Sequence, residues 1–147
     1  MSEKSGQEKD VEEKLRNLIF ELRMLENVGN ELQVRIGIVD SALRELNMAA
    51  TTIQNLEKLK VGDELLIPTG ANSYAIAKIA NVERVLVGVG GGVIIEKPVK
   101  DAVSFLEDKA NELNKARSSL QQQLSKVLER MEVLRREVEK VTGVSKA

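Results

Sequence analysis

Residues 61–98 read VGDELLIPTGANSYAIAKIANVERVLVGVGGGVIIEKP. Short apolar runs rich in Val and Ile alternate here with Gly, Asn and Pro, which is typical of short strands rather than of a helix. The stretch therefore predicts two hairpins, with turns at 68–72 and 90–92. The four strands are expected at 64–67, 73–79, 84–89 and 93–96.

This β region is too small to bury both faces of its strands. A small sheet with open edges tends to pair with strands of another chain. We therefore predict that residues 61–98 are an assembly region. The candidate subunit-contact residues are Leu65, Ile67, Tyr74, Ile76, Val85, Val87, Val89 and Ile94.

A heptad pattern precedes the β region and predicts a coiled-coil helix over residues 11–60. Twelve of its thirteen seam positions are apolar, and Gly29 is the exception. The average spacing of 3.5 residues is that of a left-handed coiled coil. Gly62 is available to terminate the helix near Lys60. The seam comprises Val11, Leu15, Leu18, Leu22, Leu25, Gly29, Leu32, Ile36, Val39, Leu43, Leu46, Ala50 and Ile53.

A second heptad pattern of the same length follows Pro98 and predicts a helix over residues 99–142. Arg117 is its only polar seam position. Two matched arms predict an α+β fold in which a long antiparallel coiled-coil hairpin carries the β region between its helices. The ends, 1–10 and 143–147, are expected to be flexible. The second seam comprises Val99, Val103, Leu106, Ala110, Leu113, Arg117, Leu120, Leu124, Val127, Met131, Leu134, Val138 and Val141.

The composition excludes several classes of function. Of the 147 residues, 31% are charged, yet the net charge is −1, so no attraction to nucleic acid or to a membrane surface is expected. His and Cys are absent, which excludes His-based triads, zinc bound by His or Cys, and disulfides. With neither a spanning apolar segment nor a signal peptide, we expect a soluble cytoplasmic protein. We expect no enzyme activity, metal or cofactor.

The glycines at 88–92 have two interpretations. A phosphate-binding loop needs a following helix and a Lys-Ser or Lys-Thr pair, whereas Val93, Ile94 and Ile95 continue as a strand. The glycines are therefore interpreted as a hairpin turn.

Three segments resemble the α-type subunit of archaeal prefoldin, a hexameric chaperone. They are LLIPTGANSYAIAKI (65–79), VLVGVGGGVIIEK (85–97) and DAVSFLEDK (101–109). They occur in the family's order: strand, Pro-x-Gly turn, strand, Val-x-Val-Gly strand, glycine turn and helix start. The similarity extends over residues 11–142.

The resemblance implies a hetero-hexamer of two α and four β subunits, whose hairpins close an oligomeric β-barrel. Six coiled coils project from this body, and their tips hold unfolded polypeptides without ATP and deliver them to a group II chaperonin. The related γ-type prefoldins assemble into filaments. A filament or scaffold protein therefore remains the alternative.

The open end of the coil carries more apolar residues than its seam requires. Ile19, Phe20, Val133 and Val144 lie off the seam, where a two-stranded pairing cannot cover them all. The alternative is that the seam residues only close the last turns of the coil. The candidate residues for binding unfolded polypeptide are Val11, Leu15, Leu18, Ile19, Phe20, Leu134, Val138, Val141 and Val144.

Overall fold

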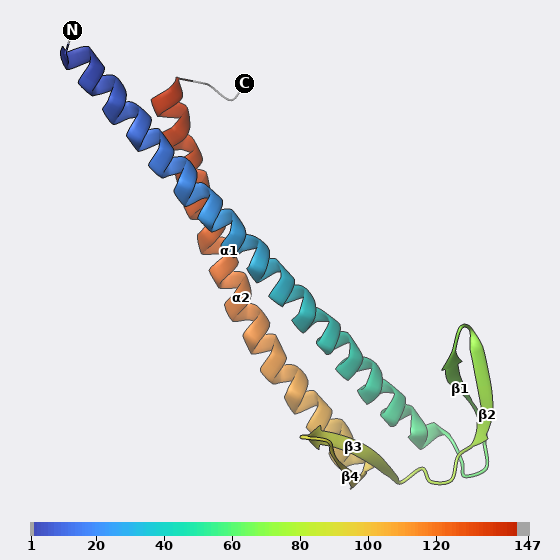
Figure 1. Cartoon of the computed structure of the whole chain (residues 1–147). Coiled ribbons are helices and arrows are strands. Elements are labelled where there is room, and N and C mark those ends of the chain that lie inside the picture. Colours follow the sequence, from blue (N-terminus) through green and yellow to red (C-terminus); the bar gives the residue numbers. More distant parts are fainter. Residues whose placement is uncertain (1, 144–147) are drawn as a thin grey trace. The chain divides into compact units, whose positions relative to one another are not determined.

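The computed structural model describes residues 2–143, which form two long helices with two β-hairpins between them (Figure 1). This order confirms the predicted α+β coiled-coil hairpin fold. None of the helices in residues 2–143 is both long and apolar enough to cross a bilayer. The elements are α1 (Ser2–Asn55), the 3-10 helix η1 (Leu56–Lys58), β1 (Glu64–Gly70), β2 (Ser73–Lys78), β3 (Arg84–Gly90), β4 (Val93–Pro98) and α2 (Val99–Thr142).

The chain divides into two compact units. The tip unit combines residues 2–40 of α1 with residues 115–143, and the hairpin unit comprises Ser41–Asn114. Both helices contribute residues to each unit.

The helices of the tip unit run antiparallel and pack through the predicted seam. Leu32 and Ile36 of α1 pack against Leu124 of α2, with Leu120 and Val127 at the edge of this cluster. Along both helices every seam position except Val11 is buried or half-buried, which confirms the two heptad patterns. Burial of this continuous apolar stripe is what stabilises helices of such length.

Gly29 lies in the seam, where a Cβ atom would meet Val127 Cγ1 at 3.7 Å and Leu124 Cδ1 at 3.8 Å. These are ordinary van der Waals separations, so a methyl group fits without displacing either neighbour. Gly29 therefore weakens the helix without being needed for close packing.

We expect Gly29→Ala to stabilise the chain by about 1 kcal/mol, because alanine has the higher helix propensity and its methyl group becomes buried. Gly37→Ala is the matched control, because Gly37 is an exposed position on the same helix with no atom within 4 Å of the added methyl group. Thermal unfolding followed by circular dichroism measures both. Destabilisation by Gly29→Ala, with Gly37→Ala stabilising, would mean that the helices need closer contact at Gly29.

α1 begins at Ser2, nine residues before the expected start at residue 11. Residues 3–10 are rich in Glu and Lys, which are good helix formers, and acidic groups near a helix N-terminus interact favourably with its dipole. Extending an existing helix also avoids the cost of nucleation. Of the expected flexible C-terminal segment, residues 144–147 lie outside the described part of the chain.

α1 ends at Asn55, five residues before the expected Lys60. One turn of 3-10 helix follows, and a tight turn then leads into β1. In this turn the backbone N–H of Lys60 donates to Asp63 Oδ2 at 2.8 Å, and Gly62 has a φ of +92°. Gly62 and Asp63 therefore redirect the chain, as expected, but at some distance from the helix end.

Both hairpins are antiparallel, and β1, β3 and β4 extend beyond the predicted strands, whereas β2 ends one residue early, at Lys78. The first strand was expected to stop before Pro68, yet Pro68 pairs with Tyr74 and β1 continues to Gly70. A proline is tolerated because a two-stranded sheet has only edge strands. The turn residues are Ala71 and Asn72, with φ of 50° and 60°, and in the second hairpin Gly91 and Gly92.

The two hairpins have the same architecture, offset by 20 residues along the chain. β1 starts at Glu64 and β3 at Arg84. Each has a register shift just before a two-residue turn, between Pro68 and Gly70 or between Gly88 and Gly90. A backbone hydrogen bond closes each base: Ile79 N–H donates to Asp63 O at 3.0 Å, and Val99 N–H to Glu83 O at 2.9 Å. The side chains of Ile79 and Val99 are both buried.

Candidate functional site

The first hairpin exposes apolar side chains on both faces. Its register places Leu66 opposite Ile76, and these side chains are 67% and 74% exposed. Tyr74 shares their face, because side chains alternate along a strand. Leu65 and Ile67 lie on the other face and are also exposed. All four of these predicted assembly residues, Leu65, Ile67, Tyr74 and Ile76, are thus accessible in the single chain.

The second hairpin is partly covered on one face. Val87 is only 5% exposed, and Val85 and Val89 of the same strand are half-buried. We had predicted Val87 as a subunit contact, but its side chain is packed within its own chain. The opposite face carries Leu86 and Ile94, which are both exposed.

Sequence reasoning missed four exposed hairpin residues. Leu66 and Leu86 occupy equivalent positions in the two-fold repeat, and Val93 and Ile95 lie on β4. The alternation of strand side chains was the available signal, because residues two apart share a face. The sequence does not give the strand register. Without the register, it could not be told which face of each hairpin is covered by the rest of the chain.

The predicted tip residues separate into buried, half-buried and exposed groups. Leu18 and Leu134 are buried, and Leu134 has no exposed surface. The sequence predicts both as binding residues, but both pack inside the helix pair. They are therefore not part of the accessible surface. Leu15, Val138 and Val141 are half-buried, and Val144 lies outside the described residues.

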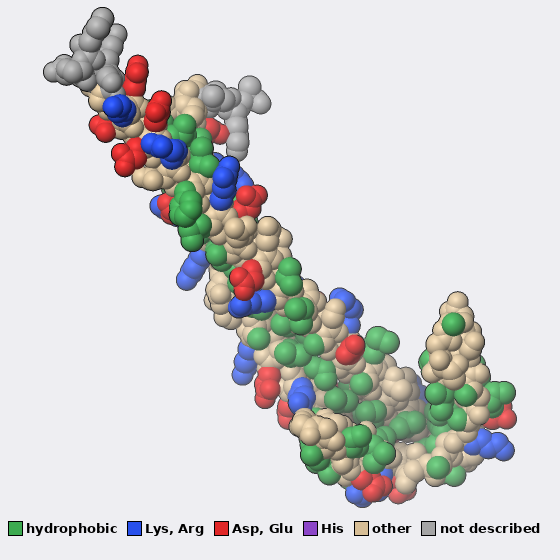
Figure 2. Space-filling view, in the orientation of Figure 1, with side chains coloured by type: hydrophobic (Ala, Val, Ile, Leu, Met, Phe, Trp, Pro, Cys, Tyr) green, Lys and Arg blue, Asp and Glu red, His purple; other side chains and the backbone are tan. Residues whose placement is uncertain are grey.

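The exposed apolar side chains of the tip unit are mostly off the seam. Val11, Ile19 and Phe20 are accessible, and the Phe20 side chain is 66% exposed. Met24 and Val133 are also exposed, although neither is among the predicted binding residues. Figure 2 shows hydrophobic side chains interspersed with charged ones over the helices, and hydrophobic side chains on the hairpins. The candidate tip surface is therefore Val11, Ile19, Phe20, Met24 and Val133.

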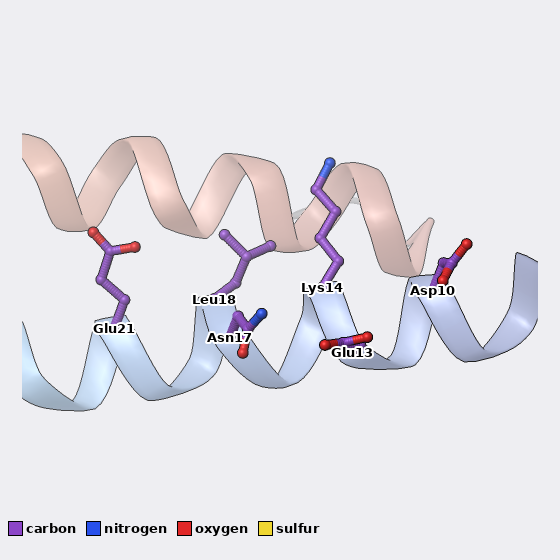
Figure 3. Close-up of a pocket in the computed structure, with 6 residues that line it drawn as sticks. All are labelled: Asp10, Glu13, Lys14, Asn17, Leu18 and Glu21. Atoms are coloured by element: carbon purple, nitrogen blue, oxygen red, sulfur yellow. The ribbon is translucent and has the colours of Figure 1, made fainter.

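A shallow hollow of about 300 Å³ lies along α1 in the tip unit. Figure 3 shows that the Leu18 side chain points from α1 toward α2, in agreement with its burial. The other lining residues are polar or charged: Asp10, Glu13, Lys14, Asn17 and Glu21. An open, charged hollow does not have the apolar lining of a small-molecule pocket.

Two ion pairs link the helices of the tip unit. Arg117, the polar exception in the second seam, pairs with Asp40 of α1, and Arg130 contacts Glu21 at 3.2 Å. The hydrogen bond from Arg117 to Asp40, together with the charge of Asp40, raises the pKa of the Arg117 guanidinium. Because Arg117 and Asp40 are separated by 77 residues, their pairing depends on the register of the helices.

Both the sequence and the fold of this chain match known proteins. The prefoldin subunit family model matches residues 25–143. Prefoldin subunit alpha of Methanopyrus kandleri is 33% identical over 84% of this chain and 78% of the relative, and that of Thermofilum pendens is 32% identical over 78% and 88%. A chain of filamentous PFD from Methanocaldococcus jannaschii, solved by cryo-EM, superposes with a TM-score of 0.69 at 25% identity, over 80% of this chain and 97% of that one. With a family match over most of its length, this chain belongs to the prefoldin subunit family.

Proposed function

We propose that the chain is the α-type subunit of a cytoplasmic, ATP-independent prefoldin that holds unfolded polypeptides and delivers them to a group II chaperonin. The observation that carries this proposal is the exposed apolar surface of the tip unit, beyond what the seam buries. Family membership and the prefoldin α names of its relatives support the chaperone role.

The tip surface suits unfolded polypeptides, the clients of the chaperone, because they have no fixed shape. Apolar burial is non-directional, so the surface contacts any chain that exposes apolar side chains. Each side chain contributes at most about 1.5–3 kcal/mol when fully buried. A single tip therefore binds weakly, and firm holding requires several tips that grip one client together.

The first hairpin supports assembly with other subunits. Both of its faces are apolar and exposed in the single chain. Within the hairpin unit, the outer edges of β1 and β2 have no strand partner. We propose that the hairpins join those of β-type subunits in a β-barrel, in a hexamer of two α and four β chains. Homotypic pairing through the same surfaces would give the alternative, a γ-type filament or scaffold, which the likeness to filamentous PFD favours.

The test is dilution of a chemically unfolded model protein in the presence of this chain, with and without a β-type prefoldin subunit. Light scattering reports aggregation, and native mass spectrometry reports the assembly. We expect suppression of aggregation, without added ATP, by a complex of hexameric mass. Long homopolymers that give no protection would instead establish the filament alternative.

A further inference from the structure

The outward face of α1 in the tip unit carries a row of exposed apolar side chains. Phe20, Met24, Val34 and Ile38 are all more than half exposed, Val34 and Ile38 at 63% and 65%. We call these four residues the α1 stripe. Val34 and Ile38 lie beyond the candidate tip surface and have no place in the seam.

Helix geometry places the four residues on one face. At about 100° per residue, they fall within an arc of about 80°. The buried seam residues Leu18, Leu32 and Ile36 lie on the opposite side, about 120–160° from Phe20. The stripe therefore faces away from α2 and takes no part in closing the coil.

α2 has no corresponding row in the tip unit. Its exposed large apolar side chains there are Leu128 and Val133. These two are five residues apart, about 140° around the helix, so they lie on different faces. Exposed apolar residues that occur singly are ordinary on a protein surface, but an aligned set confined to one helix indicates a binding surface.

Polar residues divide the stripe into two apolar pairs. Asn27 and Glu31 lie on the same face between Met24 and Val34, and the exposed Val28 lies at the margin of this face, about 80° from Phe20. Glu31 already forms an ion pair with Arg35 at 2.6 Å, so the carboxylate does not require a charged partner. A ligand for this face therefore needs apolar groups at two places and tolerates a polar middle.

We propose that the α1 stripe binds an extended, unfolded polypeptide segment that presents apolar side chains at both ends. The stripe is about 27 Å long, which is the length of about eight residues of extended chain. The midpoints of its two apolar pairs are about 21 Å apart, or about six extended residues. This inference rests on the proposed holding of unfolded clients and extends their binding surface from the tip along α1.

The size and position of the stripe favour an unfolded segment over a second folded copy. Each partner in a standard protein interface contributes about 800 Å², whereas even an aromatic side chain buries only about 150–250 Å² and three of these four are smaller. Four side chains on one helix therefore do not support a stable dimer. The stripe is also continuous with the candidate tip surface through Phe20 and Met24.

The test compares two variants of the full chain in its assembled complex. Val34→Gln with Ile38→Gln alters only the part of the stripe outside the tip surface, and glutamine is the better helix former, so α1 is preserved. Met48→Gln is the control, because Met48 is an exposed α1 side chain outside the stripe. The probe is fluorescently labelled α-lactalbumin that has been reduced and carboxymethylated to keep it unfolded.

We expect the double variant to bind the probe about tenfold more weakly than the wild type, with unchanged complex mass, and Met48→Gln to bind like the wild type. A photo-crosslinker at position 34 should attach to the probe. Equal affinities of the double variant and Met48→Gln, or crosslinks only to another subunit, would overturn the inference and leave tip binding intact. A wild-type complex that fails to bind the probe at all would overturn the proposed function as well.

Discussion

Replacement of Leu66 and Ile76 together by glutamate should leave a folded monomer that joins no complex. The two side chains face each other across the first hairpin and are among its most exposed apolar groups. In the single chain both glutamates remain in water, so the fold is preserved. In an assembly they would be buried without partners, and we expect association to weaken at least about a hundredfold.

Native mass spectrometry with a β-type subunit measures this loss, and circular dichroism checks that the helices persist. Leu86→Glu is the informative comparison, because Leu86 is the equivalent residue in the second hairpin. Its cross-strand partner is already Glu96, so that face is less apolar and the substitution should weaken assembly less. Full hexamer formation by the Leu66/Ile76 variant would show that this face is not an interface.

Substitution of Ile19, Phe20 and Val133 by glutamine should abolish most of the protection of unfolded clients. All three side chains are exposed and off the seam, so the helix pair loses no internal packing and gains slightly in helix propensity. The apolar groups proposed to hold the client are lost from every tip of this type at once, which also removes the benefit of multivalent binding. The ratio of complex to client needed to halve aggregation should rise at least about tenfold.

Aggregation assays at several ratios of complex to client provide this measurement. The control is Met48→Gln, which removes an exposed apolar side chain from the hairpin unit instead. Thermal unfolding should show no loss of stability in any variant. Undiminished protection by the triple variant would place client contact elsewhere in the complex.

The two hairpins have the same architecture, but the chain covers them to different extents. Equivalent positions differ in their surroundings: Val87 is buried, whereas Ile67, twenty residues earlier, is exposed. The second hairpin leads directly into α2, where Val99 and Ala102 are buried. The second hairpin is thus partly covered within the hairpin unit, whereas the first exposes apolar side chains on both faces.

Local pattern was sufficient to predict most of the architecture. The 4,3 spacing predicted both helices and their seams, because apolar residues at 3.5-residue intervals line one face of a helix. Alternation and turn residues predicted the two hairpins. The errors were at element ends: at Pro68 the strand continues because a two-stranded sheet leaves one side of each strand free, and at Ser2 good helix formers extend α1.

The sequence by itself determined the periodicities, and with them the helix pair, the hairpins and an apolar surplus at the open end. Only the tertiary structure decided which members of that surplus are accessible: Leu18 and Leu134 are buried, whereas Phe20 is exposed. It also decided which hairpin face is covered and that Arg117 meets Asp40. The physical reason is that periodicity is a property of neighbouring residues, whereas burial depends on the register between segments far apart in the chain.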